Sequence, residues 1–300
     1  MFGNAIALTG GLLTDIHAKT THGLLRESER FKLVGIIDEE HAGKYSNDVL
    51  DGLLQNVRIY SSVEDFIKNS EEPALYCILG VATKGGIIPD NIRGQIKEAI
   101  NEGLHIINGL HTYVSEIEEL NTLANQREVE IYYIRKPRPS HELAFWSGKI
   151  KEVTAPRIAV LGTDCAVGKR TTAWLATREL RKQGIKAEMI YTGQTGWMMG
   201  SKYGFIFDAT INDFISGELE HAIYECFVNE NPDVIFLEGQ SSLRNPSGPC
   251  GSEFLISGEA KYTILQHHAG REKFNGFGKI NNLLPTLRDD VELIRIYGSE

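Results

Sequence analysis

The residues best suited to chemistry form the segment GTDCAVGKRTT at 162–172, which directly follows the apolar run of residues 157–161. At a turn from a strand into a helix, such a glycine-containing segment presents backbone N–H groups and the helix dipole to a phosphate. Lys169 adds a point charge for the terminal phosphates. We therefore predict a phosphate-binding loop whose cofactor-binding residues are Gly162, Thr163, Asp164, Cys165, Ala166, Val167, Gly168, Lys169, Arg170, Thr171 and Thr172.

This segment departs at two positions from the common phosphate loop, which has a glycine five residues before the second glycine and Ser or Thr after the lysine. Thr163 takes the position of the first glycine, and Arg170 takes that of the hydroxyl that binds magnesium. One helical residue is a rotation of about 100°, so Thr171 does not simply replace that hydroxyl. Either other groups hold the metal or none is used, and the loop favours a phosphorylated cofactor other than Mg-ATP.

Glu238 directly follows another apolar run, residues 234–237. Ligands of open parallel sheets gather at the carboxyl ends of the strands, which makes Glu238 a candidate general base or metal ligand. The alternative is a loop carboxylate capped by neighbouring amides. The predicted catalytic residues are Glu238, Lys169 and Arg244, whose guanidinium would hold a substrate carboxylate through two hydrogen bonds.

Other polar residues of this half are weaker candidates. Gln194 in the TGQTG segment is predicted to hydrogen-bond the cofactor, and Asp213 is a second metal ligand only where magnesium is used. One of His267 and His268 could reach the site as a base, although a structural histidine is the commoner role. Cys165 could be a nucleophile in the loop, although a small residue filling tight space is the commoner case.

Short apolar runs alternate with helical stretches along the whole chain, which predicts an α/β protein with two parallel-sheet domains. Ser61 with Glu64 has the pattern of a capping box, and Asp90 is expected to cap a helix that stops at Gly103. Helices are also expected at 168–184 and 209–230. Strands are expected at 5–8, 33–37, 75–79, 105–107, 157–161, 189–191, 234–237 and 263–265.

A proline-rich basic stretch near 135–140 interrupts the alternation and marks a domain boundary. We predict a Rossmann-like domain at 1–140, a linker at 141–156 and a domain like those of P-loop NTPases at 157–300. In the first domain, Gly10 and Gly11 do not extend to GxGxxG. Asp38 after the second strand is therefore only a weak signal for a ribose-binding acid.

Composition excludes several classes of protein. A net charge of -9 disfavours a general nucleic-acid binder, which needs a basic face. No run of about 18 apolar residues predicts a membrane span, and four dispersed cysteines without CxxC predict neither disulfides nor a zinc site. We expect a cytoplasmic homo-oligomer that binds neither nucleic acid nor membrane and takes a small substrate with a carboxylate and an amine.

Two resemblances extend this interpretation. GTDCAVGK and the later Glu-Gly pair are similar to the loop and acidic strand end of dethiobiotin synthetase, an ATP-dependent carboxylate-activating enzyme. Over nearly the whole chain, GTDCAVGK, TGQTG, DFISGELE and EGQSSL resemble the signature series of the D-glutamate N-acetyltransferase-like family. That family pairs an N-terminal Rossmann-like domain with a C-terminal P-loop domain, and GLHTYVSE at 109–116 fits the first of these.

The family resemblance implies an enzyme that moves an acetyl group from acetyl-CoA to the amine of an acidic amino acid such as D-glutamate. An ATP- and magnesium-dependent ligase or kinase, with Glu238 and Asp213 on the metal, is the alternative that follows dethiobiotin synthetase. A non-catalytic nucleotide or metabolite sensor is a further alternative. The residues carried over from the family are Gly162, Thr163, Asp164, Cys165, Gly168, Lys169, Gln194, Asp213, Glu238 and Gln240.

Overall fold

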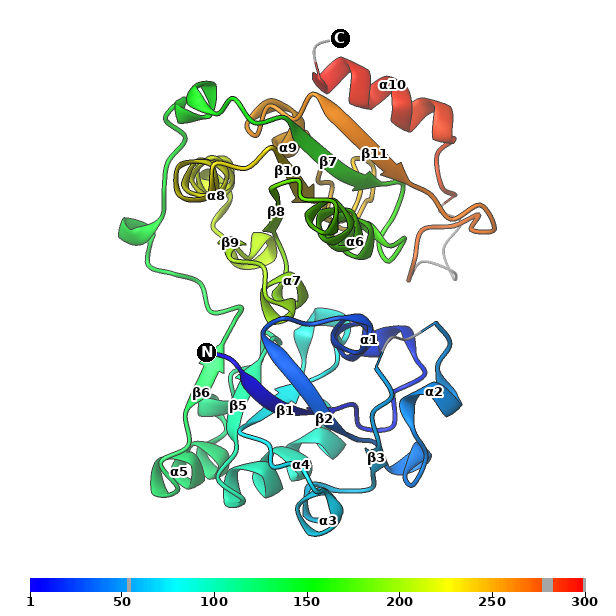
Figure 1. The fold of residues 1–300 in the computed structure, drawn as a ribbon, viewed down its shortest axis with the longest axis vertical. Helices are drawn as coiled ribbons and strands as arrows, with labels where there is room; N and C mark the ends of the chain where they lie inside the picture. Colours follow the sequence, from blue (N-terminus) through cyan, green and yellow to red (C-terminus); the bar gives the residue numbers. More distant parts are fainter. Residues whose placement is uncertain (53–54, 277–282, 299–300) are drawn as a thin grey trace. The chain divides into compact units, whose positions relative to one another are not determined.

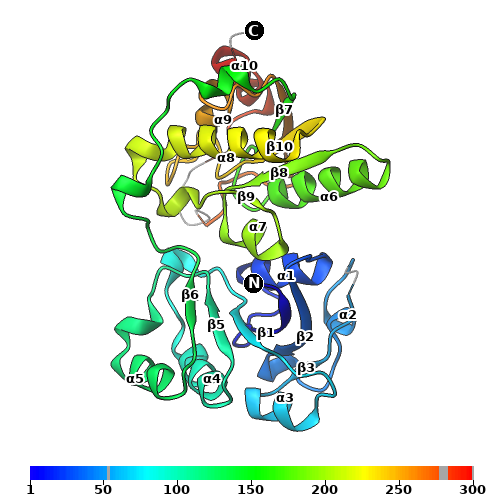
Figure 2. The same ribbon diagram turned by 60° about the vertical axis from the view of Figure 1, so that its left-hand side comes forward.

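The computed structural model describes residues 1–52, 55–276 and 283–298. The chain divides into two compact units, one of Met1–Lys136 with Met198–Gly200 and one of Pro137–Trp197 with Ser201–Glu300. Each unit is built around its own parallel sheet with flanking helices (Figures 1 and 2). The predicted α/β class with two parallel-sheet domains is confirmed. No helix in the described ranges has the length and apolar character needed to cross a membrane.

The first unit contains a six-stranded sheet in the order β3-β2-β1-β4-β5-β6. All of its pairings are parallel, and the order reverses between β1 and β4, as in Rossmann-like folds. The strands are nearly continuous apolar runs because helices cover both faces of such a sheet. They are β1 Gly3–Leu8, β2 Phe31–Ile37, β3 Ile59–Tyr60, β4 Tyr76–Leu79, β5 His105–Asn108 and β6 Ile131–Tyr133.

The helices of this unit are α1 Lys19–Arg26, α2 Ser46–Val49, α3 Val63–Asn69, α4 Asp90–Asn101 and α5 Glu118–Gln126. The expected capping box is wrong by one residue: Ser62, not Ser61, caps α3 and accepts from the Asp65 amide at 3.0 Å. Asp90 is also not a cap, because it is the first helical residue of α4 and Pro89 precedes it. At α3 the neighbouring Ser61 and Ser62 are both suited to cap the helix, whereas at α4 the N-cap position is taken by Pro89, which has no capping side chain.

The second unit contains a five-stranded parallel sheet in the order β11-β7-β10-β8-β9. Glu238 pairs with Val160 across β10 and β7, and Gln266 pairs with Gly162 across β11 and β7. The carboxyl ends of the three strands therefore meet at one edge of the sheet. The strands are β7 Arg157–Gly162, β8 Ala187–Tyr191, β9 Tyr203–Gly204, β10 Val234–Glu238 and β11 Tyr262–Gln266.

Five helices accompany this sheet: α6 Lys169–Lys182, α7 Gln194–Met199, α8 Ile215–Glu230, α9 Ser252–Ile256 and α10 Leu287–Gly298. Helix α6 packs on β7, β8 and β10, and α8 packs on β8 and β9. The expected strands are all present in the two units. The short strands β3, β6 and β9 were not expected, because two or three residues leave too little pattern to identify a strand.

The segment predicted as a linker, 141–156, belongs to the second unit, which begins at Pro137. Two buried carboxylates on α8 hold it. Glu218 accepts from the Ala144 amide at 2.7 Å, and Glu220 accepts from the amides of Ser147, Gly148 and Ile150. The proline-rich composition resembles a linker, but these contacts anchor the segment on the domain.

Gly217 makes the close packing of this segment possible. A Cβ atom at this position would lie 2.2 Å from the carbonyl oxygen of Ala144, which is too close for any side chain. The backbone of residue 144 therefore lies directly on the first turn of α8. This contact connects the DFISGELE motif to the segment that precedes β7.

Candidate phosphate-binding site

The phosphate loop joins β7 to α6 at the carboxyl edge of the sheet. Gly162 ends β7, and a Cβ there would lie 2.6 Å from Cγ2 of Val167 and 3.1 Å from Cδ of Lys169. Ala166 and Gly168 adopt left-handed backbone conformations, with φ of +53° and +102°. Gly162 thus lets the loop fold back over the strand end, which gives the displaced glycine a structural role.

Lys169 is the first residue of α6 and is almost fully buried. Its ammonium donates to the carbonyl oxygen of Asp164 at 2.7 Å and to that of Ser241 at 2.6 Å. Ser241 lies in the loop after β10 and has a φ of +38°. The first-turn amides of a helix lack intrahelical acceptors and favour an anion. Lys169 therefore brings a positive charge to the carboxyl edge of the sheet, where the N-terminus of α6 already favours an anion.

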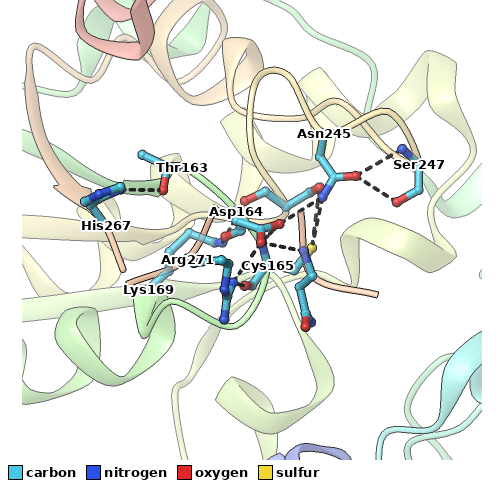
Figure 3. A network of polar contacts seen from close by, with 10 residues as sticks. Thr163, Asp164, Cys165, Lys169, Asn245, Ser247, His267 and Arg271 are labelled. Atoms are coloured by element: carbon cyan, nitrogen blue, oxygen red, sulfur yellow. Dashed lines mark hydrogen bonds and ion pairs between the residues drawn. The ribbon is translucent and has the colours of Figure 1, made fainter. Parts of the chain in front are cut away.

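Asp164 is fully buried, and its carboxylate is used inside the protein (Figure 3). Oδ1 accepts from the Cys165 amide at 2.7 Å and from Nδ2 of Asn245 at 3.2 Å. Oδ2 accepts from Nη1 of Arg271 and from the Asn275 amide, both at 2.7 Å. The side chain thus connects the phosphate loop to the loops after β10 and β11. Asp164 was predicted to bind the cofactor, but both of its carboxylate oxygens contact other parts of the protein.

Cys165 lies within the loop, and His267 lies beside it (Figure 3). The thiol of Cys165 is partly exposed and lies 3.6 Å from Nδ2 of Asn245 and 3.7 Å from Oγ of Ser241. The exposed ring of His267 lies with Nδ1 3.1 Å from Oγ1 of the buried Thr163. The second histidine, His268, is exposed. The structure thus brings one histidine of the pair to the loop.

Glu238 ends β10 and is only 4 % exposed. Its Oε2 accepts from the Thr192 amide at 3.0 Å, and its main-chain oxygen accepts from the Thr192 hydroxyl at 2.6 Å. Gln240 donates to the same hydroxyl at 2.9 Å. Burial raises the pKa of Glu238 above its ordinary value, and the positive charge of Arg170 is the largest influence that opposes this shift. Because Glu238 pairs with Val160 of β7, the carboxylate lies at the same edge of the sheet as the phosphate loop.

The TGQTG segment, predicted as a loop, is partly helical, because α7 begins at Gln194. A Cβ on Gly196 would lie 2.7 Å from Oε2 of Glu238 and 2.6 Å from Cβ of Tyr191. The first turn of α7 therefore packs directly on the carboxylate. Gln194 is buried in this turn. Gly196 thus allows a close approach of the α7 backbone to the side chain of Glu238.

The guanidinium of Arg244 has partners within the protein. Its Nε donates to Oδ1 of Asp290 at 3.1 Å, its Nη1 lies 3.6 Å from Oδ2 of Asp289, and its Nη2 donates to the Thr286 carbonyl. Asp289 and Asp290 begin α10. In this structure the guanidinium therefore contacts two carboxylates of the protein itself, Asp290 by a hydrogen bond and Asp289 at 3.6 Å.

Asp213 is not brought to the site. It is exposed in the 3₁₀ turn Asn212–Phe214, while Glu238 is buried beside Arg170. Among the residues that the structure describes, no group of three His, Cys, Asp or Glu side chains is arranged to hold a metal. The pair predicted for magnesium thus consists of one buried and one exposed carboxylate.

Sequence reasoning missed the role of Arg271 and Asn275, which follow β11. Arg271 also donates from Nη1 to the Cys165 carbonyl oxygen at 2.7 Å. The one available signal was position, since both residues come soon after a strand that ends beside β7. Without the strand order, neither residue could be linked to the loop at Asp164.

Residues 144–300 match the P-loop domain, and residues 39–137 the Rossmann-like domain, of a family described as a domain of unknown function, DUF1611. A protein named D-glutamate N-acetyltransferase from Pseudoalteromonas is 30% identical over 72% of this chain and 62% of its own length. One of the same name from Tritonibacter scottomollicae is 30% identical over 66% of this chain and 58% of its own.

The match thus spans less than two thirds of the length of both relatives. A crystal structure of a DUF1611 family protein from Anabaena variabilis is 29% identical and covers 99% of this chain and 82% of that one, with a TM-score of 0.86. Its fold is that of both units described above. The chain therefore belongs to the DUF1611 family, with an N-terminal Rossmann-like and a C-terminal P-loop domain, and has distant homologues named D-glutamate N-acetyltransferase.

Proposed function

We propose that this chain is an acetyl-CoA-dependent N-acetyltransferase that acts on an acidic amino acid such as D-glutamate. The observation that carries the proposal is the buried carboxylate of Glu238, which pairs in the sheet with Val160 of β7, the strand that leads into the phosphate loop. The names of the two relatives support the choice of reaction. The proposal explains a site that has a phosphate loop without the hydroxyl that usually binds magnesium.

In this proposal the phosphates of CoA bind at the N-terminus of α6. They are held and not hydrolysed, so the reaction needs no hydroxyl after Lys169. Backbone amides and the Lys169 ammonium supply the attraction for the anion. Arg170 adds a second cation at the position where Mg-ATP enzymes place Ser or Thr.

Glu238 acts as the general base. Its carboxylate takes a proton from the substrate ammonium, and the neutral nitrogen attacks the thioester carbonyl carbon. The C–N bond forms, the C–S bond breaks, and the second proton of the nitrogen accompanies CoA as it leaves as a thiol. Burial raises the pKa of Glu238, which makes it a stronger base than an exposed glutamate. Backbone N–H groups steady the oxyanion of the tetrahedral intermediate.

Arg244 recognises the substrate carboxylate by exchange. Its contact with Asp289 is long, at 3.6 Å, and Asp289 is half exposed. A substrate carboxylate can replace this partner while the 3.1 Å contact with Asp290 keeps the guanidinium in place. This step makes Arg244 selective for acidic substrates.

The experiment is a CoA-thiol release assay on the purified protein with acetyl-CoA and D-glutamate, L-glutamate or D-aspartate. N-acetyl-D-glutamate, whose amine is blocked, is the control and is expected to give no thiol. Calorimetric titration with CoA, and with ATP with and without magnesium, runs in parallel. Tight magnesium-dependent ATP binding without CoA binding would overturn the proposal in favour of a ligase or kinase. CoA binding without turnover of any acidic amino acid would favour a sensor.

A further inference from the structure

We propose that Arg271 is a positioning residue that neutralises Asp164, and that the phosphate loop binds anions only because this charge is cancelled. The inference rests on the anion-binding role of the loop in the proposed function, and it holds for any phosphorylated ligand. It concerns a pair that neither the phosphate-loop pattern nor the proposed chemistry uses.

A buried carboxylate is an unusual component of a loop that attracts phosphate. Asp164 is fully buried, and its main-chain oxygen accepts from the Lys169 ammonium, so its charge lies close to the lysine that would meet the ligand. A like charge in a low-dielectric surrounding repels a phosphate strongly. Without a partner, Asp164 would oppose the attraction that Lys169 provides.

Arg271 supplies that partner from the loop after β11. Its Nη1 lies 2.7 Å from Oδ2 of Asp164, and its side chain is only 17% exposed (Figure 3). The carboxylate also receives neutral donors from Cys165, Asn245 and Asn275, which place it but do not change its charge. Within the described ranges, Asp164 forms its ion pair with Arg271. Arg271 is therefore the group that cancels its charge.

The same nitrogen of Arg271 also sets the direction of a loop amide. Nη1 donates to the Cys165 carbonyl oxygen at 2.7 Å. In a trans peptide the C=O and the following N–H point in opposite directions, so the Ala166 N–H points away from Arg271. Ala166 is held in a left-handed conformation, with φ of +53°, which costs free energy without support from its surroundings. Arg271 thus contributes both charge and loop shape.

The alternative is that the pair only holds two loops together. The two interpretations predict different ligand affinities for the double variant, in which both charged side chains are replaced. If Arg271 acts by neutralising Asp164, Arg271→Met leaves an uncompensated carboxylate, and adding Asp164→Asn relieves it. If the pair only holds the two loops together, the double variant lacks the same connection and is expected to bind the ligand no more tightly than Arg271→Met.

The test is calorimetric titration of the full chain with CoA and, separately, with inorganic pyrophosphate. Arg271→Met is expected to raise Kd roughly 10- to 100-fold, because it leaves a buried charge unpaired. Adding Asp164→Asn is expected to recover a large part of that loss, on the order of 5-fold or more. Arg271→Lys keeps the charge and is expected to bind better than Arg271→Met.

Arg181 and Glu188 give a matched control in the same unit, since they form an ion pair of 2.7 Å at the opposite end of α6 and β8. Glu188→Gln is expected to leave Kd within about 2-fold, because this pair is remote from the phosphate loop. A double variant that binds as weakly as Arg271→Met would overturn the inference. So would an Arg271→Met variant that binds like the wild type.

Thermal unfolding of each variant separates loss of fold from loss of binding. If Arg271→Met does not fold, Arg271→Lys and Asp164→Asn are compared instead. The inference then requires Asp164→Asn to bind pyrophosphate at least as tightly as the wild type, and weaker binding contradicts it. Wild-type protein that binds pyrophosphate but does not turn over acetyl-CoA would refute the proposed function while leaving this inference testable. A wild type that binds neither ligand refutes both.

Discussion

The two parallel-sheet units both carry a turn after a central strand, yet the turns are used differently. In the first unit, residues 9–13 follow β1, and Asp38 at the end of β2 lies beside them. Asp38 is fully buried and accepts from Oγ1 of Thr9 at 2.6 Å, from the Leu13 amide at 3.1 Å and from Nδ1 of His41 at 2.7 Å. The acid that would bind a ribose in a dinucleotide-binding domain here binds the protein's own turn.

Side chains of α4 also occupy the space next to this turn. A Cβ on Gly10 would lie 2.7 Å from Cγ1 of Ile92, and Nδ2 of Asn91 donates to the Gly10 carbonyl at 2.7 Å. In the second unit the loop at 162–168 is instead lined by the cations Lys169 and Arg271. The comparison teaches that strand order provides a place for a ligand. The side chains that fill or charge the turn decide whether one binds.

Replacing the proposed base is expected to have the largest effect and to test the second unit directly. Glu238→Gln keeps an oxygen that can accept from the Thr192 amide but cannot take a proton. We expect kcat for thiol release to fall roughly 100- to 10,000-fold, with CoA affinity little changed. Glu253→Gln, on the nearby helix α9, is a control expected to keep its activity. An unchanged kcat in Glu238→Gln would remove Glu238 from the chemistry.

The lysine of the loop is expected to have the next largest effect. Lys169→Ala removes the buried ammonium that bridges Asp164 and Ser241, and we expect Kd for CoA to rise roughly 100-fold or more. Lys182→Ala, at the exposed far end of the same helix, is the matched control. Calorimetry measures both. Full affinity in Lys169→Ala would show that this lysine does not hold the phosphates of CoA.

The filled turn of the first unit predicts an effect on stability and none on binding. Asp38→Asn removes the charged acceptor of Thr9 and His41, and we expect the free energy of unfolding to fall by about 1–3 kcal/mol. Urea unfolding measures this change, and titration with CoA is expected to give the wild-type Kd. A variant with normal stability but weakened CoA binding would mean that the first unit contributes to the ligand site.

Glu238→Gln is also expected to change stability in a pH-dependent way. Burial raises the pKa of Glu238 above 4.5, so the folded state holds this proton more tightly than the unfolded state. The wild type therefore loses stability as pH rises from about 4.5 through the raised pKa. The variant has no such proton, and its stability relative to the wild type is expected to increase over that window and then level off. A constant difference would contradict burial as the cause.

The smallest expected effect is a shift of the pH profile in Arg170→Met. The positive charge of Arg170 lowers the pKa of Glu238 against the effect of burial. Its removal is expected to raise that pKa, so the acidic limb of kcat/KM moves to higher pH. Arg178→Met, further along α6, is the control for loss of a cation on the helix. An unchanged pH profile would show that the charge of Arg170 does not influence the pKa of Glu238.

The phosphate loop and the alternation of strands were predictable because both depend on local pattern. A glycine-containing turn between an apolar strand and a helix has few other uses, and buried parallel strands appear as short apolar runs. The start of α3 was misplaced because Ser61 and Ser62 are equally suited to cap it by residue type. The linker was misread because composition alone does not reveal the buried carboxylates Glu218 and Glu220 that hold the segment.

The site itself was only partly predictable. Glu238 could be proposed from its place after a buried strand, but its pKa direction depends on burial and on the charge of Arg170. Arg244 was expected to meet a substrate, and the structure gives it Asp289 and Asp290 as partners. These carboxylates lie more than forty residues away in the chain, where residue spacing carries no information about contact.

The sequence by itself determined the two α/β domains, the phosphate loop and the acidic strand end, because each follows from neighbouring residues. The tertiary structure alone decided that Asp164 is paired with Arg271 and that Asp38 binds its own turn. It also decided that Gly196 brings α7 onto Glu238. The physical reason is that charge compensation and steric filling depend on which strand ends are adjacent, and strand order is fixed only when the sheet assembles.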